Sequence, residues 1–558
     1  RGGAAAGDGG FVEVSSAGVL TYTGQVDAGA SSGEPGTLLL DPFDVVIVDG
    51  LYAPEPNETV LTVEKLQDDL AAMNVDIRSP VGGDPEGGDI TLLDALAWNS
   101  ENRLLLEARQ DLTLNGPVSA ANGEVFLAAS GSIAINSPIR VPNGRLSIVA
   151  SGSGVNVRTG PQGAVDVGVF ALNSGWWQQV GVLPAFNARD FRLGGDSTFT
   201  RANGGNGEIT SPFSVVDAFG LQGVGSGTTS GLAFSLGTSI DASGTEFWND
   251  GDGGPLGFRP IAGFTGALQG NFLPIANLHS GFPNAGLFGS VTEADLRNFS
   301  LVGVDLEYNG GGAAGAVAAR ADSATIRFVD ASGTLTVPTT LPFDFDNSIG
   351  GIVGEMTGGT LANAQADMDI DVRAAPDRES DNLYVGGGVG RTIGDARLSR
   401  LDIRTDISID SDENVTAGGA VGRLAPGSTV STSRSAGQVE ASGDMPFLRL
   451  GGFAGSVNAP GGVEGPPPAA IGRSRSTVDV RFTGRNTGAD GAVGGFVGRN
   501  EGIIDETAAE GSVSGFFAGR PFYLGGHTGR NEGRISDSYT LAPVSVGLSA
   551  PAAAGVGS

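Results

Sequence analysis

Cysteine is absent from the 558 residues, and lysine and histidine are nearly absent. Without cysteine there is no disulfide bridge, so a secreted form of this chain must be stabilised by packing alone. Lys65 is the only lysine, and the two histidines, His279 and His527, stand far apart. A Ser-His-Asp nucleophile or a Cys/His zinc site cannot be assembled convincingly from this inventory. We therefore expect no enzyme activity and no tightly bound cofactor.

Positive charge and long apolar runs are also scarce. Acidic residues outnumber basic ones 62 to 32, which gives a formal net charge of −30. So acidic a chain repels DNA, RNA and anionic lipid. No apolar run reaches the roughly 20 residues that a membrane-spanning helix needs. The sequence predicts neither nucleic-acid binding nor membrane insertion.

Glycine, by contrast, is abundant at 94 residues and lacks the Gly-X-Y period of collagen. Between residues 103 and 157, short strands with apolar residues two apart recur with a fixed offset. Leu106, Leu127 and Ile148 are equivalent positions, 21 residues apart. Period-two alternation places one set of side chains on one face, and a fixed repeat stacks equivalent strands on each other. The pattern predicts an all-β fold, a right-handed parallel β-helix with apolar rungs inside.

An antiparallel meander is the alternative. Asn122-Gly123 and Asn143-Gly144 have the composition of two-residue hairpin turns. Parallel stacking requires the same 21-residue offset in every rung, whereas a meander does not. The constant offset therefore favours the parallel arrangement.

The C-terminal half carries a different repeat, Gly-Gly-x-x-Gly, in seven copies ending at Gly315, Gly354, Gly390, Gly422, Gly455, Gly498 and Gly529. We interpret these glycines as corner devices, because neighbouring coils can approach closely where there is no Cβ. Each repeat could hold two short coils. With 20–25 residues per coil, about 25 coils would make a rod on the order of 100 Å long. Pro376 to Asn382 and Pro460 to Pro468 are expected to be surface loops.

Several segments resemble the large secreted adhesins of the filamentous haemagglutinin type, which are exported by two-partner secretion. The resemblance rests on Gly10–Ser15, Gly36–Pro42, Leu61–Leu70, Trp176–Gly181 and Gly220–Gly225. From Phe258–Ile261 to Gly286–Gly289 the chain looks like the entry to GLUG-type repeats, and the copies ending at Gly498 and Gly529 match best. The copy at Gly311 departs, with alanines in place of larger apolar residues.

The resemblance implies the domain organisation and the location. Residues 1–50 would follow the family's export domain, 51–160 would hold the 21-residue repeats, 161–254 a continuation with irregular insertions, and 255–558 the GLUG-like repeats. It implies an outer-membrane export partner and a secreted or cell-surface protein. Neither end has the features of a natural terminus, so we expect a longer protein.

Two sets of residues are candidates for ligand binding. Asp250 and Asp252, in Asn249–Gly254, and Asp410 and Asp412, in Asp406–Glu413, supply oxygen ligands suited to Ca²⁺. A solvated turn explains the same residues equally simply. Trp176 and Trp177 could stack on a glycan; adjacent strand residues face opposite sides, so one of them must leave the core.

The enzyme alternative is a polysaccharide-binding or polysaccharide-degrading β-helix. Hydrolysis needs two carboxylates across a groove, and Asp367, Asp369 and Asp371 point the same way if they share a strand. An exposed strand face gives the same pattern without chemistry. The uninterrupted repeats favour instead the structural stem of a bacterial surface adhesin or extracellular filament. Its partners would be a cell-surface receptor or glycan, or copies of itself.

Overall fold

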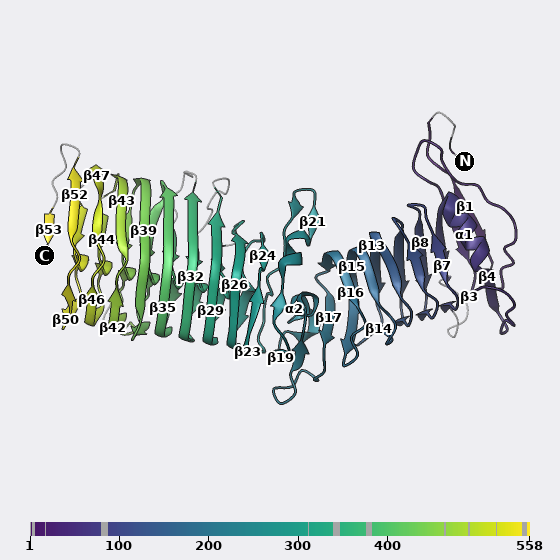
Figure 1. Cartoon of the computed structure of the whole chain (residues 1–558), viewed down its shortest axis with the longest axis horizontal. Helices are drawn as coiled ribbons and strands as arrows, with labels where there is room; N and C mark the ends of the chain where they lie inside the picture. Colours follow the sequence, from purple (N-terminus) through teal and green to yellow (C-terminus); the bar gives the residue numbers. More distant parts are fainter. Residues whose placement is uncertain are drawn as a thin grey trace.

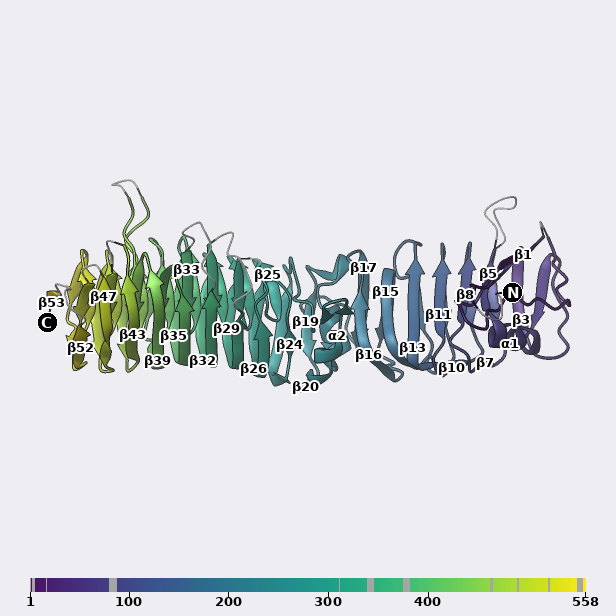
Figure 2. The same cartoon turned by 90° about the horizontal axis from the view of Figure 1, so that it is seen from above.

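The computed structural model describes the chain except residues 1, 3–5, 17, 80–87, 311, 339–345, 375–381, 462–464, 489–490, 520–521, 549–554 and 558. The protein is all-β, and its strands lie side by side along one long axis, from the N-terminal strands at one end to the C-terminal strands at the other (Figure 1). Figure 2, turned by 90°, shows the same row of strands, so the molecule is elongated in both views.

The N-terminal stack is one sheet system that ends at Ala202. Its strands are β1 (Phe11–Ser15), β2 (Thr37–Asp41), β3 (Asp44–Val48), β4 (Glu58–Thr62), β5 (Asn74–Arg78), β6 (Ile90–Leu92), β7 (Leu96–Trp98), β8 (Arg103–Ala108), β9 (Leu112–Leu114), β10 (Val118–Ala120), β11 (Glu124–Ala129), β12 (Ile133–Ile135), β13 (Ile139–Ala150), β14 (Val157–Thr159), β15 (Val165–Val180), β16 (Phe186–Leu193) and β17 (Ser197–Ala202).

The C-terminal stack has one sheet of mostly long strands and two sheets of short strands. The long sheet contains β18 (Phe213–Val215), β19 (Ala233–Leu236), β20 (Ile240–Asp241), β23 (Ala267–Ala276), β24 (His279–Ser280), β26 (Asp295–Glu307), β29 (Thr325–Val337), β32 (Thr360–Ala374), β35 (Arg397–Ser411), β38 (Thr429–Ser431), β39 (Arg434–Met445), β42 (Ala470–Ser476), β43 (Asp479–Asn486), β46 (Ile503–Ala509), β47 (Val513–Gly519), β50 (Arg534–Ser536), β51 (Tyr539–Thr540) and β52 (Val544–Leu548).

The first short sheet holds β25 (Phe288–Thr292), β28 (Ala318–Asp322), β31 (Val353–Thr357), β34 (Val389–Ile393), β37 (Val421–Leu424), β41 (Ala454–Val457), β45 (Val497–Asn500) and β49 (Thr528–Asn531). The second holds β27 (Ala313–Gly315), β30 (Asn347–Gly350), β33 (Asn382–Gly386), β36 (Asn414–Gly418), β40 (Leu448–Gly451), β44 (Gly491–Gly494), β48 (Phe522–Gly525) and β53 (Gly555–Gly557). A separate antiparallel pair joins β21 (Asp250–Gly251) to β22 (Gly254–Pro255).

The 21-residue register is confirmed. Leu106 pairs with Leu127, and Leu127 pairs with Ile148, each in parallel strands, and all three are fully buried. The hairpin alternative is wrong. β11 pairs in parallel with β8 and β13, and Asn143 Nδ2 donates to Asn122 Oδ1 at 3.2 Å, so the asparagines stack between layers.

The Gly-Gly-x-x-Gly motif forms the corner between the two short sheets. In the six layers from Gly350 to Gly529, one short strand ends at the first glycine, and the next short strand starts two residues beyond the second. The copy predicted to end at Gly315 is out of register, because Gly315 pairs with Gly350 and so stands at the first-glycine position of its layer, where Ala316 and Ala319 replace the other two glycines. Gly350 pairs with Gly386 and Gly386 with Gly418, so the first glycines form a column. A Cβ on Gly350 would lie 1.9 Å from the carbonyl oxygen of Val353, which only glycine avoids.

Each of these repeats is a single layer, which corrects the expectation of two coils per repeat. β29 pairs with β32, and β32 pairs with β35, over most of their length. Long strands bend at residues with positive φ, for example Asn363 (52°) in β32 and Arg400 (52°) in β35. The bend lets a long strand change direction, and each repeat adds one layer to each of the three sheets. The estimate of about 25 coils is therefore too high.

The two stacks do not share a hydrogen-bonded sheet, which corrects the expectation of an uninterrupted run of repeats. Among the described residues, no strand pairing links β17 to β18. The junction contains α2 (Ala218–Gly223), the 3-10 helices η1 (Gly227–Thr229) and η2 (Ser243–Phe247), and the β21–β22 hairpin, all near the middle of Figure 1. The boundaries expected after residues 50, 160 and 254 stay predictions, but the sheets change between Ala202 and Phe213.

The other helix, α1 (Val63–Ala72), lies at the N-terminal end and packs against β4, β5 and β7 (Figure 1). Its buried Val63, Leu66 and Leu70 recur at helical spacing. Within the described residues, one apolar cluster runs from Leu20 to Leu524 along the interior of the molecule. The loop expected at Pro376 to Asn382 lies mostly outside the described residues, as does the part of Pro460 to Pro468 at 462–464.

Candidate ligand-binding surface

The tryptophan pair predicted for glycan stacking is divided between the two faces of β15. Trp177 is fully buried, and its ring stacks on Phe199 with the centroids 5.9 Å apart. Trp177 therefore cannot contact a glycan, and that assignment is wrong. Trp176 is half-buried on the outer face, where its indole N–H donates to Thr200 Oγ1 at 3.3 Å. The alternation expected for adjacent strand residues is confirmed.

The four aspartates predicted for Ca²⁺ lie in two distant places. Asp250 and Asp252 are exposed at the β21–β22 hairpin. Asp410 and Asp412 are exposed at the end of β35; Asp410 accepts a hydrogen bond from Ser442 Oγ at 3.2 Å, and Asp412 one from Asp444 N–H at 2.6 Å. Within the described ranges, no group of three or more His, Cys, Asp or Glu side chains could hold a metal ion. Calcium binding stays a prediction that this geometry does not favour.

Asp367 and Asp369 are exposed on β32, whereas Met368 and Ile370 between them are buried. The aspartates thus share one face, as predicted, on a sheet whose next strand places Arg404 beside Asp367 and Asp406 beside Asp369. Asp371 forms an ion pair with Arg373 at 2.9 Å. The three aspartates are not among the residues that line the main hollows of the described surface, which does not favour the groove that hydrolysis needs.

Two hollows of the surface lie near the junction of the two stacks. A cavity of about 230 Å³ has an apolar floor that includes Phe191, Val224 and Ile261. Its polar lining is already satisfied: Gln222, for example, accepts from Arg259 N–H and donates to the Arg259 carbonyl, both at 2.8 Å. A groove of about 420 Å³ lies next to this cavity, and the two share Arg259, Pro260 and Ala262 as lining residues.

This groove, the junction groove, has a mixed lining. It is formed by Arg259, Pro260, Ala262, Phe282, Pro283, Asn284, Gly289, Ser290 and Arg320. The residues come from three segments that are not adjacent in sequence: the approach to β23, the β24–β25 region, and β28. Two guanidinium groups, one aromatic ring and two small polar side chains therefore meet in one place on an otherwise acidic protein.

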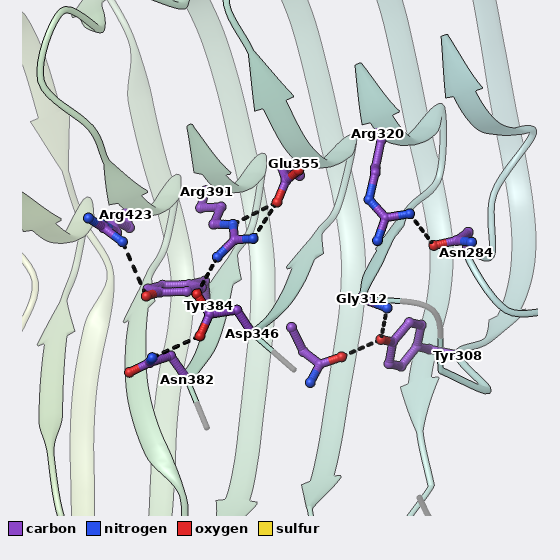
Figure 3. Close-up of polar contacts among 11 residues, drawn as sticks. Asn284, Tyr308, Gly312, Arg320, Asp346, Glu355, Asn382, Tyr384, Arg391 and Arg423 are labelled. Carbon is purple, nitrogen blue, oxygen red and sulfur yellow. Dashed lines mark hydrogen bonds and ion pairs between the residues drawn. The ribbon is translucent and has the colours of Figure 1, made fainter. Parts of the chain in front are cut away.

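From the groove, a column of side chains follows the first short sheet. Strand pairing aligns Ser290, Arg320, Glu355, Arg391 and Arg423 in successive layers. Figure 3 shows Arg320, Glu355, Arg391 and Arg423 of this column, the guanidinium column. Arg320 turns toward Asn284, whereas Arg391 lies between Glu355 and Asp346. Further along, Ser456, Arg499 and Arg530 continue the column.

Arg391 is held in the column by two carboxylates and an aromatic ring. Its Nε donates to Glu355 Oε2 and its Nη1 to Asp346 Oδ2, both at 2.7 Å. Its guanidinium also lies 5.1 Å from the ring centre of Tyr384. Burial lowers the pKa of Arg391, but the two carboxylates outweigh that effect and hold the pKa above its ordinary value. Arg423 covers the same ring at 5.6 Å and donates to the Tyr384 hydroxyl at 3.2 Å.

Tyr308 fixes the backbone where the column begins. Its hydroxyl donates to Asn347 Oδ1 and accepts from Gly312 N–H at 2.8 Å (Figure 3). Burial raises the pKa of Tyr308 to about 12, so the hydroxyl stays protonated and can donate. A Cβ on Gly312 would lie 2.5 Å from Arg320 Nη2, so this glycine makes room for the guanidinium of Arg320.

The sequence contained a signal for the guanidinium column that our sequence analysis missed. In four copies, arginine directly follows the last glycine of Gly-Gly-x-x-Gly, at Arg391, Arg423, Arg499 and Arg530. A residue that recurs at one point of a repeat forms a column when the repeats stack. The junction groove had no such signal, because its residues converge only in the folded chain.

Comparison with known proteins gives limited matches, and no family model matches the chain. It is 34% identical to halomucin from Haloquadratum walsbyi over 185 aligned positions, which cover 29% of this chain and 2% of halomucin. The chain thus corresponds to a very small part of that relative's length. A solved structure of a Bacteroides ovatus protein assigned as an immunoglobulin A1 protease aligns with 50% of this chain and 79% of its own, at 16% identity and a TM-score of 0.35. A TM-score this low does not establish a shared fold.

In the part of the chain that the structure describes, no helix is long and apolar enough to cross a membrane. The findings together describe an elongated, acidic, all-β protein with parallel sheets and a partial similarity to halomucin.

Proposed function

We propose that this chain is a structural segment of a secreted or surface-exposed protein, a rigid stem built as a right-handed parallel β-helix. The observation that carries the proposal is the in-register parallel pairing of equivalent strands, layer after layer, along most of an elongated molecule. Such stacking makes a rod whose length grows with the number of repeats. A net charge of −30 keeps the long surface soluble, and the partial similarity to halomucin supports a surface-related role.

The proposed role does not require catalysis. His279 pairs with Asp305 at 3.0 Å on the long sheet, and His527 packs on Phe496 within the glycine corner. Both histidines thus have structural surroundings. Export by an outer-membrane partner, in the manner of the filamentous haemagglutinin type, is the transport route that we propose for this stem.

Negative-stain electron microscopy of the purified chain tests the proposed architecture. We expect thin rods with a bend or narrowing near the middle, where the sheets change between Ala202 and Phe213. Surface labelling of intact producing cells with an antibody against the rod tests the location. Compact particles would contradict the rod, and labelling only after cell lysis would contradict the surface role.

A further inference from the structure

The junction groove is the part of the surface with the composition of a binding site. Its volume of about 420 Å³ is within the range of small-ligand pockets and suits one or two sugar rings. It lies where the β-stacks meet, and loops at such places can vary without disturbing the layers.

Arg259 is held in place at one side of the groove. Gln222 bonds both the N–H and the carbonyl of Arg259, and the guanidinium donates to the Leu193 carbonyl at 3.2 Å and lies 5.5 Å from the ring centre of Phe282. In the described chain, Arg259 has no carboxylate partner. A guanidinium that is held in position and has no carboxylate partner within the protein is suited to bind the carboxylate of a ligand.

Arg320 approaches the groove from the guanidinium column. Its Nη1 donates to Asn284 Oδ1 at 2.9 Å, so this end of the guanidinium turns toward Asn284, which also lines the groove (Figure 3). Further along the column, Arg391 shows how a carboxylate is held there, because Glu355 in the next layer bonds its Nε. On the groove side of Arg320, the aligned position is Ser290 rather than an acidic residue.

The remaining lining favours a sugar as the carrier of that carboxylate. Phe282, Pro260 and Pro283 offer apolar surface to the C–H face of a ring. The Ser290 hydroxyl accepts from Gly263 N–H at 2.8 Å, which leaves its own proton to donate, and Asn284 adds an amide. Groups of this kind bond hydroxyls.

We propose that the junction groove binds a carboxylated saccharide, with Arg259 and Arg320 bonding the carboxylate and Phe282 packing against the ring. This site is independent of the proposed stem role. If the chain forms rods but binds no saccharide, the binding proposal fails and the stem proposal is unaffected. If compact particles bind the saccharide, the stem proposal fails and the binding proposal is unaffected.

Isothermal titration calorimetry tests the site on the full chain. The probes are a uronate trisaccharide, a neutral trisaccharide with the same linkage, and a sulfated trisaccharide. We expect binding of the uronate and none of the neutral sugar. Arg259→Gln and Arg320→Gln should each weaken uronate binding about tenfold or more, because each removes a charge-assisted hydrogen bond. Arg327→Gln is the matched control: it removes the same charge from an exposed position on β29 of the long sheet.

Melting temperatures of all variants must match the parent before affinities are compared. If Arg259→Gln loosens the junction, Arg320→Gln decides the test. Absence of uronate binding, equal binding of the neutral sugar, or equal losses in Arg327→Gln would overturn the proposal. Equal or tighter binding of the sulfated sugar would overturn the carboxylate assignment.

Discussion

At the residue scale, His527 occupies a column that other layers fill with apolar side chains, including Ile352, Phe453 and Phe496. Its ring stacks on Phe496 with centroids 5.1 Å apart, and its Nε2 lies 3.0 Å from Thr507 Oγ1. Burial lowers the pKa of His527 to about 4. The folded protein therefore favours the neutral imidazole, as expected for a histidine tolerated in an apolar column.

The lowered pKa makes the stability of the last layers depend on pH. The stabilisation from neutral His527 is complete above its unfolded pKa of about 6.5 and is lost as pH falls to about 4, by up to about 3 kcal/mol. We expect His527→Phe, which matches Phe453 and Phe496, to lose less stability than the parent over this interval. The measurement is hydrogen exchange of β45 and β49 at several pH values. Parallel losses in the two proteins would contradict the role assigned to His527.

At the scale of single elements, the glycine corner sets how close the two short sheets come. Gly386 ends β33, and a Cβ there would lie 1.9 Å from the Val389 carbonyl oxygen. No side chain can move to relieve that contact, since the atom that the Cβ would meet belongs to the backbone. This position therefore tolerates only glycine, whereas some glycines elsewhere in the stack, such as Gly472, have room.

Gly386→Ala and Gly472→Ala form a matched pair that separates these cases. A Cβ on Gly472, in β42, would have its nearest neighbour at 3.8 Å, an ordinary contact. We expect Gly386→Ala to destabilise its layer by about 2–3 kcal/mol through overpacking. Gly472→Ala should change stability by less than about 1 kcal/mol. Protection of β33 and β34 amides from exchange reports the effect of Gly386→Ala, and protection of β42 amides reports that of Gly472→Ala. Equal effects would show that the corner has no special packing.

At the scale of the whole molecule, the net charge of −30 opposes the compact state. Many arginines are engaged with nearby carboxylates, as in the pairs Arg201–Asp217 at 2.7 Å and Arg103–Asp76 at 2.8 Å. The surplus carboxylates repel one another over distances that salt screens: the Debye length falls from about 30 Å at 0.01 M to about 3 Å at 1 M.

Salt should therefore stabilise this protein. We expect the melting temperature to rise by several degrees between about 0.02 M and 1 M sodium chloride. Salt weakens both the repulsion among surplus carboxylates and the attraction within ion pairs, and at this net charge the loss of repulsion is the larger effect. Replacing sodium by potassium serves as the control and should give the same rise. A melting temperature that falls with salt would show that the local ion pairs outweigh the net charge.

Much of the architecture was predictable because it is written in local periodicity. The offset between Leu106, Leu127 and Ile148 determines which strands stack, and the recurring glycine pairs mark the corners. A strand that slips by one residue would turn its apolar face to water, so the register is strongly determined. The Trp176–Trp177 pair followed the same rule, but which of the two faces the core was not predictable.

The sequence by itself determined an acidic, disulfide-free, repetitive β-protein, because composition and period need no knowledge of distant contacts. The tertiary structure alone decided three features: that one C-terminal repeat makes one layer, that the sheets change between Ala202 and Phe213, and that Arg259, Phe282 and Arg320 share a groove. These depend on long-range packing. Residues far apart in a chain leave no common period in the sequence, and only the fold brings them together.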